Sequence, residues 1–217
     1  MKLRNINQKA IALVAAGLVL FSGATVTSLA AWSDTEFVNG GVGTLAGVSS
    51  SQFDVQQNVT SSSTLNWTTN LASPGGTVDF GALAAKLTPG TSVVGFARLR
   101  VAPNSDGGTL TLLHGASTGD LAFRNALRIG AWLHADPSDC TASGYDALGT
   151  TQLIADDSTI GTDSTVPFTL DAGTGGAAGA EKTVCFRLTL PTLADPTDKT
   201  LEGLSATPVW QFSATSN

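Results

Sequence analysis

A two-residue alternation of apolar and polar side chains recurs along this chain and constrains its fold more than any other feature. It is clearest in "SVVGFARLRVA" (92–102) and "KTVCFRLTLP" (182–191). The apolar residues that share one face are Val93, Ala97, Leu99 and Val101 in the first stretch and Val184, Phe186, Leu188 and Leu190 in the second. Because successive side chains of a strand point to opposite faces of a sheet, this pattern predicts β-strands that bury one face.

Similar alternation predicts further strands in "GTLTLLHG" (108–115), "NALRIGAWLHA" (125–135) and "SATPVWQFSA" (205–214), where Pro208 moves the start of the strand to a sheet edge. Weaker candidates are "GGVGTLAGV" (40–48), "TSSSTLNWTT" (60–69), "GGTVDFG" (75–81) and "TVPFTLDA" (165–172). Turns rich in glycine and proline separate these stretches. About nine short strands joined in this way predict an all-β fold, an antiparallel β-sandwich or jelly roll.

One short helix and one long loop interrupt the strands. "TGDLAFRNAL" (118–127) is a candidate helix in which Asp120 would cap the first turn. "ADPSDCTASGYDALG" (135–149) is predicted to be a loop, and it carries Cys140. We see neither an internal repeat nor a linker, so we expect a single folded domain.

The first 30 residues have the three parts of a secretory signal peptide. A positively charged start precedes the apolar run "AIALVAAGLVLFSGATV", and Ser28-Leu29-Ala30 offers small residues at the positions that a signal peptidase reads. A membrane anchor is the alternative, but a run of roughly 17 residues is at the short limit for spanning a bilayer. We therefore expect cleavage between Ala30 and Ala31, a mature domain over 31–217, and no stable membrane span afterwards.

The two cysteines, Cys140 and Cys185, form an even pair. In an exported protein such a pair predicts a disulfide, which the loop-entropy model values at roughly 4 kcal/mol. A zinc or redox pair is the alternative, but neither cysteine has a nearby partner cysteine or CxxC spacing. We expect the disulfide to fasten the 135–149 loop to a sheet.

The charge of the chain disfavours two classes of partner. The whole sequence has 11 basic and 17 acidic residues, a net charge of −6. Removal of the leader takes away basic residues only and makes the mature chain more acidic. An acidic field does not attract nucleic acid or anionic lipid, so we expect neither as a partner.

Two stretches resemble catalytic motifs without their surroundings. Ser117 lies in "GASTG" (115–119), which fits G-x-S-x-G, but a nucleophile elbow needs a parallel α/β sheet and the surrounding alternation is that of antiparallel strands. The glycine-rich run 173–179 lacks the Gly-Lys-Ser/Thr of a phosphate loop, and a strand follows it instead of a helix. A secreted hydrolase is therefore the least favoured function, and we predict no enzyme activity.

Histidines and acidic residues do not form a recognisable metal motif. His114 and His134 each stand alone, whereas a zinc protease site needs two histidines on one helix. The loop aspartates lack EF-hand spacing, although the sequence leaves weak calcium binding open. They are Asp136, Asp139, Asp156, Asp157 and Asp163. We predict no cofactor and no metal site.

The junction after the leader carries the most functional information. "LAAWSDTEFVNGGVGTLAG" (29–47) resembles the exit of the alternate signal peptides cut by SipW-type signal peptidases, in which Ala-Ala-aromatic-Asn/Ser-Asp straddles the cut and Gly-Thr-Leu/Phe starts a strand. The matching residues are Ala30, Ala31, Trp32, Ser33, Asp34, Gly43, Thr44 and Leu45. The body of the chain, through 87–101, 185–191 and 201–216, looks most like actinobacterial alternate-signal exported proteins, distantly TasA- and camelysin-like.

This resemblance implies a secreted jelly-roll domain and, for TasA-type members, a subunit of extracellular fibres in a biofilm matrix. The freed N-terminal segment of one subunit would complete the sheet of the next, so that a head-to-tail contact builds a filament. Here the donor would be residues 31–46. Its candidate anchors are Trp32, Phe37, Val42 and Leu45. An ordinary first strand of the same domain is the alternative.

The sequence therefore favours a non-enzymatic, secreted or cell-surface structural protein that assembles with itself and meets a SipW-type signal peptidase during export. A monomeric secreted binding module is the alternative, with loops around Cys140 and 173–179 holding a glycan, peptide or host protein. Camelysin-like relatives have been called metalloproteases. Because this chain lacks a recognisable zinc set, that activity is not carried over.

Overall fold

The computed structural model describes residues 41–42, 45–46, 51–60, 65–146, 150–195 and 197–217. The chain divides into two compact units, Met1–Ser49 and Ser50–Asn217. In the first unit, strand β1 (Gly41–Val42) pairs antiparallel with β2 (Leu45–Ala46). Within the stretch 40–48, predicted as one strand, the described residues form a pair of short strands.

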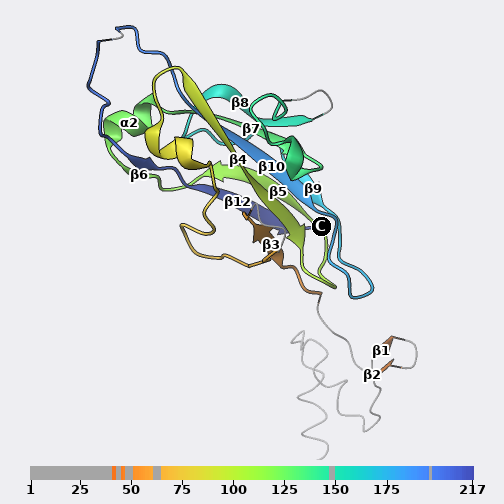
Figure 1. The fold of residues 1–217 in the computed structure, drawn as a ribbon. Coiled ribbons are helices and arrows are strands. Elements are labelled where there is room, and N and C mark those ends of the chain that lie inside the picture. Colours follow the sequence, from red (N-terminus) through yellow and green to blue (C-terminus); the bar gives the residue numbers. More distant parts are fainter. Residues whose placement is uncertain (1–40, 43–44, 47–50, 61–64, 147–149, 196) are drawn as a thin grey trace, which may run out of the picture. The chain divides into compact units, whose positions relative to one another are not determined.

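The larger sheet of the second unit has five antiparallel strands in the order β3-β4-β10-β7-β8 (Figure 1). Their bounds are Val55–Asn58 for β3, Thr91–Val101 for β4, Lys182–Leu190 for β10, Arg128–His134 for β7 and Thr151–Thr159 for β8. The central strand β10 comes late in the chain and lies between two strands that precede it. This insertion joins segments that are far apart in sequence.

A smaller sheet of three strands, in the order β12-β5-β9, packs against the larger one. These strands are β12 (Trp210–Ser216), β5 (Gly108–His114) and β9 (Phe168–Leu170). A two-stranded ladder of β6 (Thr118–Gly119) and β11 (Ala206–Thr207) lies beside helix α2 (Leu121–Ala126). The all-β sandwich prediction is confirmed, with strands β3 to β12 in this unit where about nine were expected.

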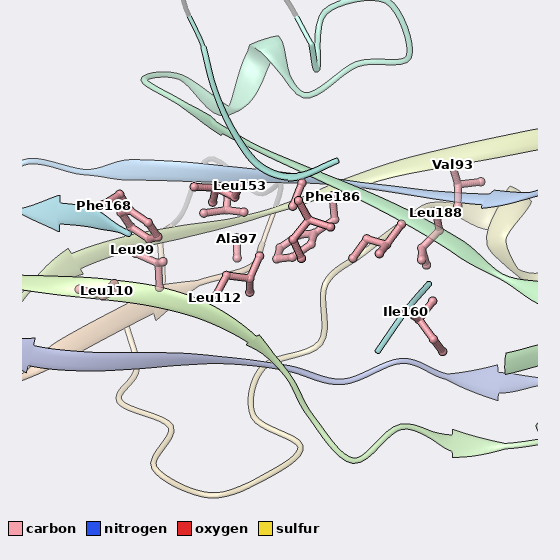
Figure 2. Close-up of a cluster of buried hydrophobic side chains, with 14 of the residues drawn as sticks. Val93, Ala97, Leu99, Leu110, Leu112, Leu153, Ile160, Phe168, Phe186 and Leu188 are labelled. Atoms are coloured by element: carbon pink, nitrogen blue, oxygen red, sulfur yellow. The ribbon is translucent and has the colours of Figure 1, made fainter. Parts of the chain in front are cut away.

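The core lies between the two sheets and is built from the alternating apolar faces (Figure 2). Leu99, Leu110 and Phe186 are no more than 1% exposed. The ring of Phe186 stacks on Trp210 of the opposite sheet, with 4.8 Å between centroids. Full burial of each such side chain contributes roughly 1.5–3 kcal/mol, so these contacts hold the two layers together.

Two of the weaker strand predictions are wrong. In the 60–69 stretch the described residues form only one bridge, in which Thr68 pairs with Gln57. The 75–81 stretch forms no strand and joins no described sheet. It runs across the inner face of β4, where a Cβ atom on Gly95 would lie 2.7 Å from Val78 Cγ1 and 2.8 Å from the Asp79 carbonyl. Gly95 thus permits this coil to cover the core without pairing.

The helix prediction is confirmed, but the predicted cap is wrong. Asp120 occupies the position before α2, yet its carboxylate makes no bond to the first turn. It accepts a hydrogen bond from the Ser205 amide at 2.9 Å instead. The Asp120 carboxylate, which the sequence predicts as the helix cap, therefore bonds to a residue that is distant in the sequence. The prediction that Pro208 places the last strand at an edge is confirmed, since β12 is an edge strand that begins after it.

Candidate functional site

The predicted cleavage residues and most of the donor segment lie outside the described residues. This holds for Ala30, Ala31, Trp32 and Phe37. The two other candidate anchors, Val42 and Leu45, oppose one another in the β1–β2 ladder. The part they would play in another subunit stays a prediction.

The predicted disulfide is confirmed. Cys140 and Cys185 are bonded, with 5.3 Å between their Cα atoms. Cys185 lies on the outer face of β10 and is fully buried. Cys140 follows a short 3-10 helix, η3 (Pro137–Asp139), in residues 135–146, which we call the covering loop. The disulfide fastens this loop over the outer face of the larger sheet. Crosslinks of this kind persist in oxidising compartments.

Beneath the covering loop, Tyr145, Asp156 and Arg187 form a polar cluster. The Tyr145 hydroxyl donates to Asp156 Oδ2 at 2.8 Å, and Arg187 Nη1 lies 3.4 Å from the same oxygen. Arg187 Nη1 also donates to the Tyr145 hydroxyl, and its guanidinium carbon lies 5.0 Å from the Tyr145 ring centroid. Tyr145 belongs to the covering loop and is only 3% exposed. The cluster therefore anchors this loop in addition to the disulfide.

Burial raises the pKa of the Asp156 carboxyl above its ordinary value, with Asp146 and Asp157 adding to the shift. The Trp132 indole N–H is near enough to oppose that shift, although neither it nor Asp156 Oδ1 completes a hydrogen bond within the described residues. The carboxylate lies directly over Gly130 of β7, where a Cβ atom would overlap Oδ1. Because glycine has no Cβ atom, the Asp156 carboxylate can pack directly against the backbone of β7 at this position.

Next to this cluster the outer face carries an open pocket of about 460 Å³. Its polar lining comes from the four neighbouring strands β4, β10, β7 and β8 and from the segment that follows β10. The lining residues with charged or hydroxyl side chains are Ser92, Arg128, Asp157, Arg187, Thr189 and Thr192. It is a depression of polar and cationic character on a chain whose overall charge is negative.

The histidines and Ser117 are not brought together as a catalytic set. The Ser117 hydroxyl accepts a hydrogen bond from the Val209 amide at 3.1 Å. His114 is half exposed and pairs with Asp163 at 2.7 Å, whereas His134 is 4% exposed and bonds to the Tyr145 carbonyl. Each group has its own local partner, so the arrangement offers no nucleophile–base pair.

No group of three potential metal ligands occurs among the described residues. Two of the loop aspartates serve local structure. Asp136 accepts from the Ser138 amide at 2.8 Å, and Asp163 accepts from the His114 amide at 2.8 Å. These bonds lower the pKa of both carboxyls.

Strand β12 exposes one edge of the smaller sheet. Asn217 donates to the Gly107 carbonyl and Gly115 donates to the Val209 carbonyl, which fixes the phase of hydrogen bonding between β12 and β5. In an antiparallel pair, every second residue directs both backbone groups toward the partner strand. Here these are the odd-numbered residues, so the even-numbered residues of β12 direct their N–H and C=O groups away from β5. No described strand pairs with that side.

The sequence matches no known family model and no curated protein. In the part of the chain that the structure describes, no helix has the length and apolar character needed to cross a membrane.

Proposed function

We propose that this protein is a secreted, non-enzymatic structural subunit that assembles by strand addition, in which residues 31–46 of one copy pair with the open edge of β12 in the next. A β-strand added to a sheet edge gains affinity from main-chain hydrogen bonds and specificity from alternate side chains. A head-to-tail contact of this kind extends into a fibre unless the geometry closes it.

The chemistry of the β12 edge carries this proposal. Its seven residues, "WQFSATS", include no charge and no proline. Natural proteins usually protect edges with charges, bulges, short strands or a covering segment. An uncharged edge of this length is therefore suited to receive another strand.

The other edges of the two main sheets carry such protection. Strand β8 contains Asp156 and Asp157, and its pairing with β7 is irregular. Strand β9 has only three residues, and β3 is bridged by Thr68. The contrast favours β12 as the acceptor.

The inner side of β12 offers contacts to an added strand. Trp210 and Phe212 are half-buried and pack against the core. The Trp210 indole nitrogen is buried and has no hydrogen-bond partner among the described residues. Further apolar side chains laid alongside this edge would bury more of both rings, at roughly 25 cal/mol per Å².

The test compares purified protein 31–217 with 47–217, by sizing and negative-stain imaging. Filaments from the first and monomers from the second are expected. The edge is tested within 31–217 by Ala214→Pro, which removes an amide that faces the open side, and Ala214→Ser is the matched control. Loss of filaments with proline and their retention with serine, at equal thermal stability, supports the β12 edge. Protein 31–217 that stays monomeric at high concentration refutes assembly.

The sequence assigns the binding-module alternative to the loops around Cys140 and 173–179. The glycine-rich loop is held in place rather than free. Gly173 donates to the Ser105 carbonyl at 2.8 Å, and Gly176 donates to Asn104 Oδ1 at 2.8 Å. An observation in favour of binding comes instead from the outer-face pocket.

A further inference from the structure

The outer-face pocket is built on two adjacent rows of the larger sheet. In one row Ser92, Thr189 and Arg128 lie side by side on β4, β10 and β7. In the next row Arg187 lies opposite Gly130. Arg187 and Arg128 are thus diagonal neighbours on one face, a spacing that long side chains bridge easily.

Arg128 is a fixed cation without an acidic partner. Its Nη1 donates to the carbonyl oxygens of Asn125, Ala126 and Leu127 at 2.7–3.0 Å, at the end of α2. The three ion pairs among the described residues do not include it. The carbonyls orient the guanidinium but do not cancel its charge, so its remaining N–H groups can serve a ligand.

The neighbouring groups add donors in fixed positions. The Ser92 and Thr189 hydroxyls lie 2.9 Å apart, and Arg187 Nε donates to the Thr189 hydroxyl at 3.3 Å. Arg187 Nη1 is held by the polar cluster below the covering loop. No described bond uses Arg187 Nη2. The disulfide, the covering loop and the cluster therefore stiffen one wall of the pocket.

We propose that this pocket binds an oxyanion group, a carboxylate, sulfate or phosphate, presented by an extracellular ligand. Two guanidinium groups and adjacent hydroxyls are the donors that such groups accept, and charge-assisted bonds from arginine to an oxyanion are about twice as strong as neutral ones. This activity is independent of filament assembly, because the pocket lies on the larger sheet and the β12 edge on the smaller one.

Asp157 limits the affinity of this site. It is exposed, lines the same pocket and adopts a left-handed backbone conformation with φ of 63°. Asparagine adopts this conformation as readily as aspartate does. Asp157→Asn therefore removes the one acidic side chain of the lining without a backbone change, and it should tighten anion binding.

The experiment follows backbone amide shifts of protein 47–217 by NMR, because this fragment contains the whole second unit. Sodium sulfate, sodium phosphate and sodium glucuronate are titrated separately at constant ionic strength in sodium chloride. The expected result is saturable shifts at Ser92 and Thr189 with at least one probe. The probe that binds best distinguishes a carboxylated from a sulfated or phosphorylated ligand.

Three variants test whether anion binding depends on the charged side chains of the pocket. Arg128→Gln should weaken binding about tenfold, and Asp157→Asn should strengthen it about threefold. Arg124→Gln removes the same charge from α2 but lies outside the pocket lining, so it should leave the affinity unchanged. Equal weakening by Arg124→Gln and Arg128→Gln, or shifts that spread over the surface without saturation, would overturn the proposal.

Discussion

Replacement of Gly130 by alanine should destabilise the fold through a single side chain, Asp156. A Cβ atom at this position would overlap Asp156 Oδ1 and lie 3.0 Å from its Cγ and 3.3 Å from its Cα. The carboxylate cannot rotate away without leaving the Tyr145 hydroxyl and Arg187. At a strand position with room for a Cβ atom the same substitution would be favourable, because alanine loses less backbone entropy than glycine.

The expected cost follows from the contacts that are lost. A hydrogen bond to a charged group contributes about 1.5–3 kcal/mol, and the half-buried ion pair with Arg187 adds less than about 1 kcal/mol. We therefore expect Gly130→Ala to lower the free energy of unfolding by about 3 kcal/mol. For a domain of this size such a loss lowers Tm by roughly 6–12 °C.

A double-mutant cycle separates this cause from a general packing effect. Asp156→Ala alone should cost about 2 kcal/mol, because it breaks the same bonds. In the Asp156→Ala background, Gly130→Ala should cost almost nothing, because the obstructing carboxylate is absent. The coupling energy, measured by urea unfolding of 47–217, should be about 3 kcal/mol. Additive costs would show that Asp156 is not the obstacle and would refute the reasoning.

Two further predictions concern the covering loop. Replacing Cys140 and Cys185 together by alanine should lower the free energy of unfolding by about 4 kcal/mol, because the unfolded chain regains the conformational entropy that the crosslink removes. Urea denaturation measures this change, and an unchanged midpoint would contradict a structural role. Burial lowers the pKa of His134, against the opposing charges of Asp139 and Asp146. The unfolded chain then takes up the proton first, so stability is full above about pH 6.5 and falls as the pH drops toward the folded-state pKa. His134→Gln should flatten this slope in thermal melts between pH 5 and 7.5, and an unchanged slope would assign it to another group.

The strands of the core could be predicted from the sequence, because each has one buried apolar face. The alternation placed β4, β5 and β10 within one or two residues of their observed bounds. The same alternation puts Cys185 on the face opposite Phe186, and the disulfide lies on that outer face. For these strands the local pattern and the tertiary environment agree.

The edge strands β3 and β8 were missed for a physical reason. In β8 the two buried residues, Leu153 and Ile154, are adjacent, because the irregular pairing with β7 breaks the period of two. In β3 the sequence is "VQQN", and the buried residue is the polar Asn58, whose amide donates to the Asn66 carbonyl at 2.9 Å. Neither strand presents the alternation that the sequence analysis relied on.

The candidate site could be predicted only in part. Parity and export were enough to predict the disulfide. The pocket depends on cross-strand register, which places Arg128 beside Thr189 and Arg187 beside Gly130. The sequence places these residues in strands, but it does not say which strands are neighbours.

The place of β10 in the larger sheet has a consequence for the order of events during folding. Strands β4 and β7 cannot form one sheet until β10, which follows both in the chain, enters between them. Cys185 belongs to this last-arriving strand, and Cys140 to the loop that closes over it. The native packing therefore brings the two sulfur atoms together only when the central strand is in place. A crosslink that closes by this route marks a chain whose larger sheet is already complete.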